Sequence, residues 1–216
     1  MKKLFYQIIC VSLLFSCKSQ LSPIELALNS NNEKILKVKK NISSHDLQIK
    51  LSVINNNKGV LISKPMDFSR RNYLPINELN HLIKLVFFPE KFKNKNKLKL
   101  EKNQIEFLKK SMSILPKDAG YDREKYFDSY VKFFVYGDKK EINSDKIKIF
   151  NKVGIAYGYL TEGAYIKTDN TSIILSATIK VNDNHIYNDD VYEYGSIGIP
   201  FFAELGREII RIVQSK

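Results

Sequence analysis

The chain has 216 residues, of which 44% are hydrophobic and 27% charged, and its formal net charge is +12 from 35 Lys+Arg against 23 Asp+Glu. This composition excludes a collagen-like, low-complexity or wholly disordered chain, and the length suits one domain or one and a half. Lysines outnumber arginines heavily, so the surface is expected to be cationic without the planar forks that clamp phosphate.

The first sixteen residues predict a signal peptide. Lys2 and Lys3 form a positive start, and the stretch from Leu4 to Phe15 is interrupted only by Gln7 and Ser12. A membrane-spanning helix needs about 20 apolar residues, so this stretch is too short to span and matches a signal-peptide core. No later stretch is apolar enough to span, so the body is predicted to be soluble and tethered.

The end of that stretch resembles the lipobox of bacterial lipoproteins. Leu13-Leu14-Phe15-Ser16 precedes Cys17, although Phe15 occupies a position where small residues are usual. The resemblance implies cleavage before Cys17 and lipid attachment there, with residue 18 favouring the outer membrane over the inner. The alternative is an ordinary cleaved signal with an incidental cysteine. Cys10 falls within the removed segment, so the mature body is expected to have no disulfide and no Cys metal site.

The first part of the mature chain predicts helices and one strand. Residues 17–43 are interpreted as a tether with one or two short helices, capped by Ser22 with Pro23 and Glu25 in capping-box spacing. The domain is placed at residues 44–216. Apolar residues alternate over 47–54, which predicts a strand, and 55–59 form a turn signal before a short strand at 60–62.

Two helices are predicted at 76–88 and 101–115, because apolar residues recur at helical spacing and each run ends at a proline. The connector and the first residues of the second helix carry six lysines, up to Lys102, and one aromatic, Phe92. A nucleic-acid groove favours aromatics and arginine, so the connector is interpreted as a solvated loop. Residues 122–136 are rich in aromatics and are interpreted as a core-forming helix or irregular segment.

Three strands are predicted at 147–158, 159–168 and 172–181, followed by a helix at 201–213. Short polar turns separate the strands, so an antiparallel meander joined by the 47–54 strand is the economical pairing. The fold class is therefore α+β, an antiparallel sheet with N- and C-terminal helices packed on it.

Several strings in the last two thirds of the chain resemble class A beta-lactamase-related serine hydrolases, the superfamily of penicillin-binding proteins. The similarity is closest to a lipoprotein branch found in Bacteroidota and covers about residues 44–213. The strings are His45–Ile49, Pro65–Ser69, Phe88–Glu90, Ser129–Phe134, Asn151–Gly158, Asn188–Tyr194 and Gly198–Phe201.

The resemblance implies a three-part site of which one part is visible. Lys152-Val153-Gly154 matches the Lys-x-Gly strand that binds substrate, and is expected at the start of a strand on the rim of a groove. The Ser-x-x-Lys nucleophile segment should follow the first strands, but that stretch is missing here. The one Ser-x-x-Lys, Ser129 to Lys132, matches the family's aromatic segment, and Ser30-Asn31-Asn32 precedes the first strand. No catalytic residue is therefore assigned.

Two functions from different classes remain open. The chain is either a non-catalytic envelope lipoprotein on a shortened beta-lactamase-like fold, or an active serine hydrolase acting on beta-lactams or peptidoglycan peptides through an acyl-enzyme. The expected partners are the membrane, through the lipid anchor, and a cell-wall peptide or beta-lactam. Nucleic acid is not expected, and the chain is expected to be a monomer.

No cofactor or metal is predicted. His45, His81 and His185 share no ligand spacing. Acidic residues surround His185, but their spacing does not fit a calcium loop, so 183–193 is interpreted as a polar loop.

Overall fold

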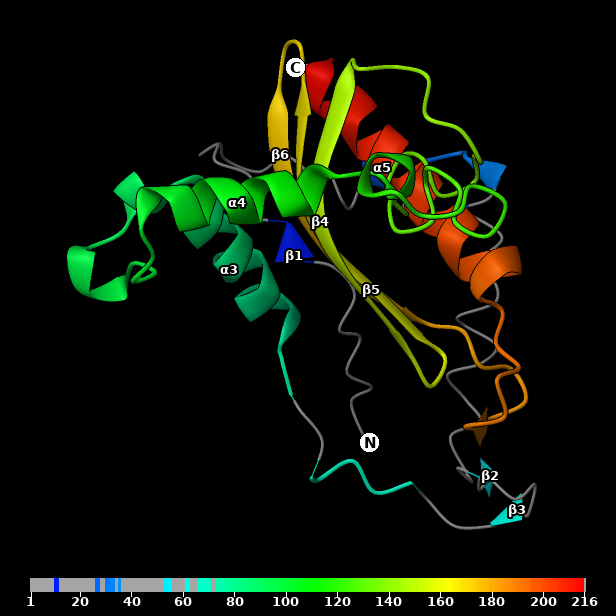
Figure 1. Ribbon diagram of the computed structural model, residues 1–216. Helices are drawn as coiled ribbons and strands as arrows, with labels where there is room; N and C mark the ends of the chain where they lie inside the picture. The colour runs from blue at the N-terminus through cyan, green and yellow to red at the C-terminus, as the bar shows by residue number, and fades with distance from the viewer. Residues whose placement is uncertain are drawn as a thin grey trace.

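The computed structural model describes residues 10–11, 26–27, 30–33, 35, 53–55, 61–62, 66–70 and 73–215 (Figure 1). The lipobox with Cys17, the predicted N-cap Ser22, and His45 lie outside the described residues.

The main sheet is an antiparallel meander, as predicted. It contains β4 (Ile147–Ala156), β5 (Tyr159–Thr168) and β6 (Ser172–Lys180). A two-residue strand, β1 (Cys10–Val11), pairs with Ser176 and Leu175 and completes the order β1-β6-β5-β4. Strand β4 therefore forms one edge of this sheet.

The 47–54 strand is predicted to join the main sheet. This is wrong for its described residues, 53 and 54. β2 (Val53–Asn55) lies in a second sheet, between β3 (Leu61–Ile62) and β7 (Ile186–Tyr187), and runs parallel to β7. Alternation predicts a strand but does not select its partner, and at Leu175–Ser176 the edge of β6 is already paired with β1. The paired segment β1 lies within the predicted signal peptide.

The core lies between the main sheet and helix α5 (Ile199–Gln214), close to the predicted 201–213. Phe202, Leu205 and Ile209 recur at helical spacing and are fully buried. Burying each such side chain is worth roughly 1.5–3 kcal/mol. The N-terminal region joins this core, because Ala27 and Ile35 are fully buried in it and Asn32 Nδ2 donates to Glu204 Oε2 at 3.1 Å. The predicted packing of the last helix is confirmed.

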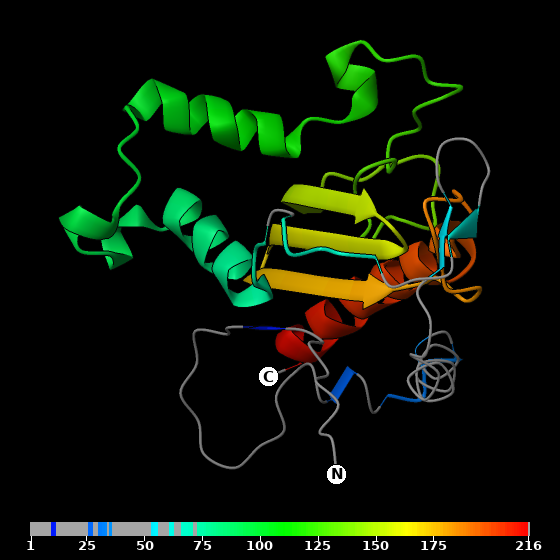
Figure 2. The same cartoon turned by 90° about the horizontal axis from the view of Figure 1, so that it is seen from below.

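Helices α3 (Ile76–Phe87) and α4 (Lys102–Ser113) cover the opposite face, as Figure 2 shows for α4 and α5 on the two sides of the sheet. Helix α3 approaches β5 so closely that a Cβ on Gly163 would lie 2.7 Å from Leu79 Cγ. Asn80 Nδ2 donates to Ser176 Oγ at 3.3 Å, which ties the same helix to β6. The two predicted helices and the α+β class are confirmed.

Short helical turns and irregular segments complete the chain. The lysine-rich connector between α3 and α4 contains two 3-10 turns, η2 (Pro89–Lys91) and η3 (Asn94–Asn96), and η4 (Pro116–Ala119) follows α4. A π-helical turn, η5 (Tyr194–Gly198), leads into α5. Residues 122–136 are irregular, one of the two predicted alternatives, and their Phe133 and Phe134 are buried in the core.

Candidate functional site

The Lys-x-Gly triplet lies in the middle of edge strand β4. The expectation that Lys152 starts a strand is wrong, because Ile147–Phe150 already pair with Tyr165–Thr168. Lys152 and Gly154 are exposed on one face, whereas Val153 is partly buried against the core. A Cβ on Gly154 would meet only Thr161 Cβ, at 4.0 Å, so the surface above this glycine is open. Lys152 Nζ donates to the carbonyl of Val153.

A tight turn follows the triplet and joins β4 to β5. Its two central residues, Tyr157 and Gly158, have φ of 55° and 81°. Two positive φ values are typical of the type I′ turn, whose twist suits a hairpin. The backbone N–H of Gly158 donates to the Tyr194 hydroxyl at 2.7 Å, and a Cβ at this position would lie 2.5 Å from Asn182 Cβ. The turn is thereby held against the segment before α5.

An open cavity of about 320 Å³ lies beside this turn. Backbone strain concentrates there: of the five non-glycine residues with positive φ in the described chain, Tyr157, Asn188 and Asp190 line it. Such conformations persist where the surroundings impose them, and they cluster at binding sites. The lining residues are Ile155, Ala156, Tyr157, Asn188, Asp190, Tyr192 and Tyr194.

Tyrosine hydroxyls are fixed around the cavity by backbone donors. Tyr192 Oη accepts from the N–H of Asn188 at 2.7 Å, as Tyr194 Oη does from Gly158. Burial raises the pKa of both tyrosines, so both stay protonated at neutral pH. A hydroxyl that accepts a hydrogen bond still carries its own proton, which it can donate to a ligand.

The loop carrying Phe68 reaches the same region. The Phe68 ring lies edge-on to Tyr157 at 5.7 Å and to Tyr187 at 5.8 Å between centroids. Edge-to-face contacts of this kind contribute about 0.5–1.5 kcal/mol each beyond area burial. The triplet and the cavity are therefore neighbours along β4: Lys152 lies on the strand, and Asp190 and the tyrosines line the cavity at the turn that follows it.

The single Ser-x-x-Lys lies on the core side of the sheet, away from this surface. Ser129 and Lys132 are 1% and 3% exposed. Ser129 Oγ donates to the Lys139 carbonyl, while Lys132 Nζ donates to the Met112 carbonyl at 2.7 Å and to Asn151 Oδ1 at 2.6 Å. Each group donates elsewhere, and the described residues show no hydrogen bond between them.

Lys132 belongs to a buried network that sequence reasoning missed. Asn151 Nδ2 donates to Glu162 Oε1, and the N–H of Phe134 donates to Glu162 Oε2 at 2.7 Å. Burial raises the pKa of Glu162 to about 8 and lowers the pKa of Lys132 to about 8. The signal that could have revealed it is an acid at an inward position of β5, between Leu160 and Ala164. The hydrogen bonds of this network join residues 132 and 134 to Asn151 of β4 and Glu162 of β5, so the network fixes the 129–137 segment to the sheet.

The histidines remain apart. His81 packs edge-on against Phe92 at 5.1 Å between ring centroids, and His185 lies in the connection from β6 to β7. Asn184 Nδ2 donates to Asp189 Oδ2 at 2.8 Å within the polar loop. In the described part of the chain, no group of three His, Cys, Asp or Glu side chains could hold a metal ion. None of the described helices has the length and apolarity needed to cross a membrane.

Comparison with known proteins adds no assignment: no family model, curated protein or solved structure matches this chain.

Proposed function

We propose that this chain is a lipid-anchored envelope protein whose shortened beta-lactamase-like domain binds a small acidic ligand without hydrolysing it. The proposed ligand is a cell-wall peptide or a beta-lactam, held along the β4 edge. The family resemblance of the sequence strings supports this proposal, together with the exposed Lys152 and the open surface above Gly154.

The binding part of the proposal draws on the position of the triplet. An edge strand presents unpaired backbone groups to which an extended peptide can add as a further strand. Lys152 supplies a charge for a carboxylate, and the cavity beyond Gly154 supplies aromatic faces and hydroxyl donors from Tyr192 and Tyr194.

The burial of Ser129 and Lys132 is the observation that carries the non-catalytic part. A serine nucleophile must reach the substrate and transfer its proton to an adjacent base. Ser129 is 1% exposed and hydrogen-bonded to Lys139, and Lys132 is held by Asn151 and Met112. An active hydrolase would require a different serine with a base at hydrogen-bond distance.

A fluorescent penicillin tests the absence of acylation. We expect no covalent adduct in the intact-protein mass spectrum and no burst of nitrocefin hydrolysis, because no activated serine is assigned. A stoichiometric adduct would favour the hydrolase alternative, and an adduct mapped to Ser129 would also show that this segment was misaligned with the family.

Binding is tested separately by titrating an acidic D-Ala-D-Ala peptide into the full chain while following backbone NMR shifts. Weak binding is expected, with the largest shifts in residues 152–157. The variant Lys152→Ala should bind the peptide with about tenfold lower affinity, since one charge-assisted contact is worth roughly 1.5–3 kcal/mol. Lys148→Ala is the matched control, because Lys148 is exposed on the same face of β4. Equal losses in the two variants would refute a specific role for Lys152.

A further inference from the structure

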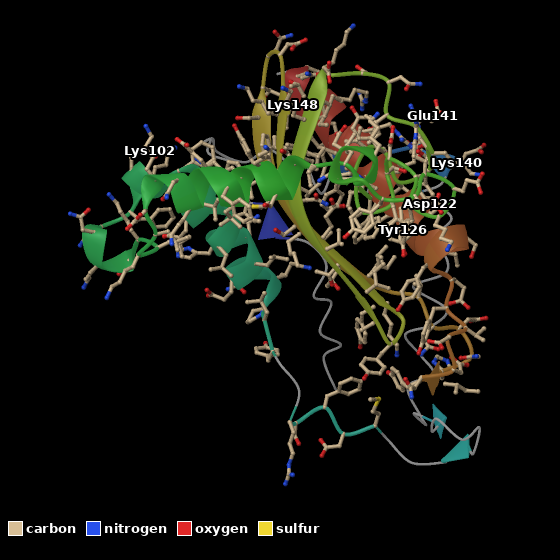
Figure 3. The ribbon with its side chains drawn as sticks, viewed as in Figure 1. Lys102, Asp122, Tyr126, Lys140, Glu141 and Lys148 are labelled. Carbon is tan, nitrogen blue, oxygen red and sulfur yellow. The ribbon has the colours of Figure 1, made fainter. Side chains whose placement is uncertain are left out.

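The connector and helix α4 carry half of the net charge of the chain. Residues 91–110 contain eight lysines and two glutamates, a net charge of +6. We name this segment the basic arm. Lys102, at the start of α4, lies far from Lys140 and Glu141, which lie at the opposite side of the molecule beyond β4 (Figure 3).

Six of the eight lysines of the basic arm are exposed, whereas Lys97 and Lys109 are partly buried. Lys91 and Lys109 lie over the rings of Phe88 and Phe87. Lys93, Lys95, Lys99 and Lys102 are all exposed. Among the described residues the single ion pair of the arm is Lys102 with Glu106, at 4.0 Å and with side chains 92% and 67% exposed. An exposed pair of this kind is weak, and two glutamates against eight lysines leave the arm with a net positive charge.

The same arm exposes apolar side chains. Helix α4 has no buried residue, and Phe107 is 72% exposed while Leu100 is 43% exposed. Phe107 lies one turn before Lys110 on α4, so an aromatic ring and an ammonium share the outer face of the helix. Apolar side chains beside lysines are typical of helices that lie in a membrane interface.

We propose that the basic arm docks on an anionic lipid bilayer, with its lysines at the headgroups and Phe107 inserted among them. Four to eight clustered lysines are typical of segments that bind anionic lipids, and one such charge near the surface contributes about fivefold in affinity. The arm contains no arginine and only two aromatics, which disfavours single-stranded nucleic acid. This proposal goes beyond ligand binding at β4 and takes from the proposed function only the membrane location.

Lysine acetylation in the presence of vesicles tests the surface directly on the full chain. Phosphatidylcholine vesicles are compared with vesicles containing one third phosphatidylglycerol, and each lysine is read by mass spectrometry. The anionic vesicles should slow acetylation at Lys93, Lys95, Lys99 and Lys102 at least threefold, with little change at Lys140. Equal rates on the two vesicles would overturn the proposal. Protection by soluble polyphosphate but not by vesicles would assign the arm to an anionic polymer instead.

Charge-matched variants provide the second measurement. The measured quantity is the partition coefficient of the protein on anionic vesicles divided by that on neutral vesicles. A lipid anchor or leader contributes to both coefficients, so its contribution cancels in this ratio. K93Q/K95Q/K99Q/K102Q should lower this ratio roughly tenfold or more, and 0.5 M salt should remove most of the difference. Its control, K125Q/K139Q/K140Q/K146Q, removes the same charge from other exposed lysines. Equal effects of the two variants would show an attraction due to net charge alone and would refute docking through the arm.

Discussion

Replacing Lys132 by methionine should lower the free energy of unfolding by about 1–3 kcal/mol for each acceptor that it leaves without a donor, namely Asn151 Oδ1 and the Met112 carbonyl. Lys132 is 3% exposed and donates to Asn151 and to the Met112 carbonyl, so water cannot replace it easily. The loss should be visible as a lower midpoint in urea denaturation followed by circular dichroism. Lys152→Met, at an exposed position, is the control and should change stability by less than about 0.5 kcal/mol.

A combined variant separates the lost charge from the lost packing. Adding Glu162→Gln to Lys132→Met removes the buried acid that Lys132 stabilises in its charged form, so part of the stability should return. A double variant as unstable as the sum of its single variants would contradict an energetic coupling between these two groups.

The pH profile of the wild type provides a further readout of the same network. Burial raises the pKa of Glu162 from 4.5 to about 8, so between these values the folded state holds more protons and stability falls as pH rises. Burial lowers the pKa of Lys132 from 10.5 to about 8, so stability recovers as pH rises from about 8. The contribution of the pair should therefore be smallest near pH 8, and the double variant should lose this minimum.

The second large effect concerns the lipid anchor. Cys17→Ala should abolish labelling of the protein by a fatty-acid analogue in growing cells, because the variant lacks the thiol that the proposed lipid attachment requires. Cys10→Ala is the matched control and should label normally, since residue 10 lies in the segment predicted to be removed. The labelled mature protein should begin at Cys17.

A chain that keeps Met1 and carries no label would contradict the proposed lipid anchor. In that case β1 would remain beside β6, where Cys10 and Val11 pair with Ser176 and Leu175. Processing at Cys17 would instead remove Cys10 and Val11, and with them their pairing to Ser176 and Leu175 on the β6 edge.

The sequence by itself determined the elements whose patterns are local. Period-two alternation located β4, β5 and β6, and the short turns between them made an antiparallel meander the natural pairing. Helical spacing located α3, α4 and α5, and prolines located the ends of the first two. The Lys-x-Gly triplet could also be recognised from the sequence, because its three residues are adjacent in the chain.

The tertiary structure decided everything that depends on distant residues meeting. Besides the nearby β3, the strand at Val53–Asn55 pairs with β7, about 130 residues later, and no local pattern encodes that second choice. Lys132 and Glu162 are 30 positions apart in the sequence, and both hydrogen-bond to the side chain of Asn151. They meet there only because the irregular 129–137 segment packs on the sheet. The tyrosine cavity forms because the β4–β5 turn meets the loop before α5. Strand and helix periodicity follow from bond geometry along the chain, whereas burial and pKa depend on which surfaces face each other in the fold.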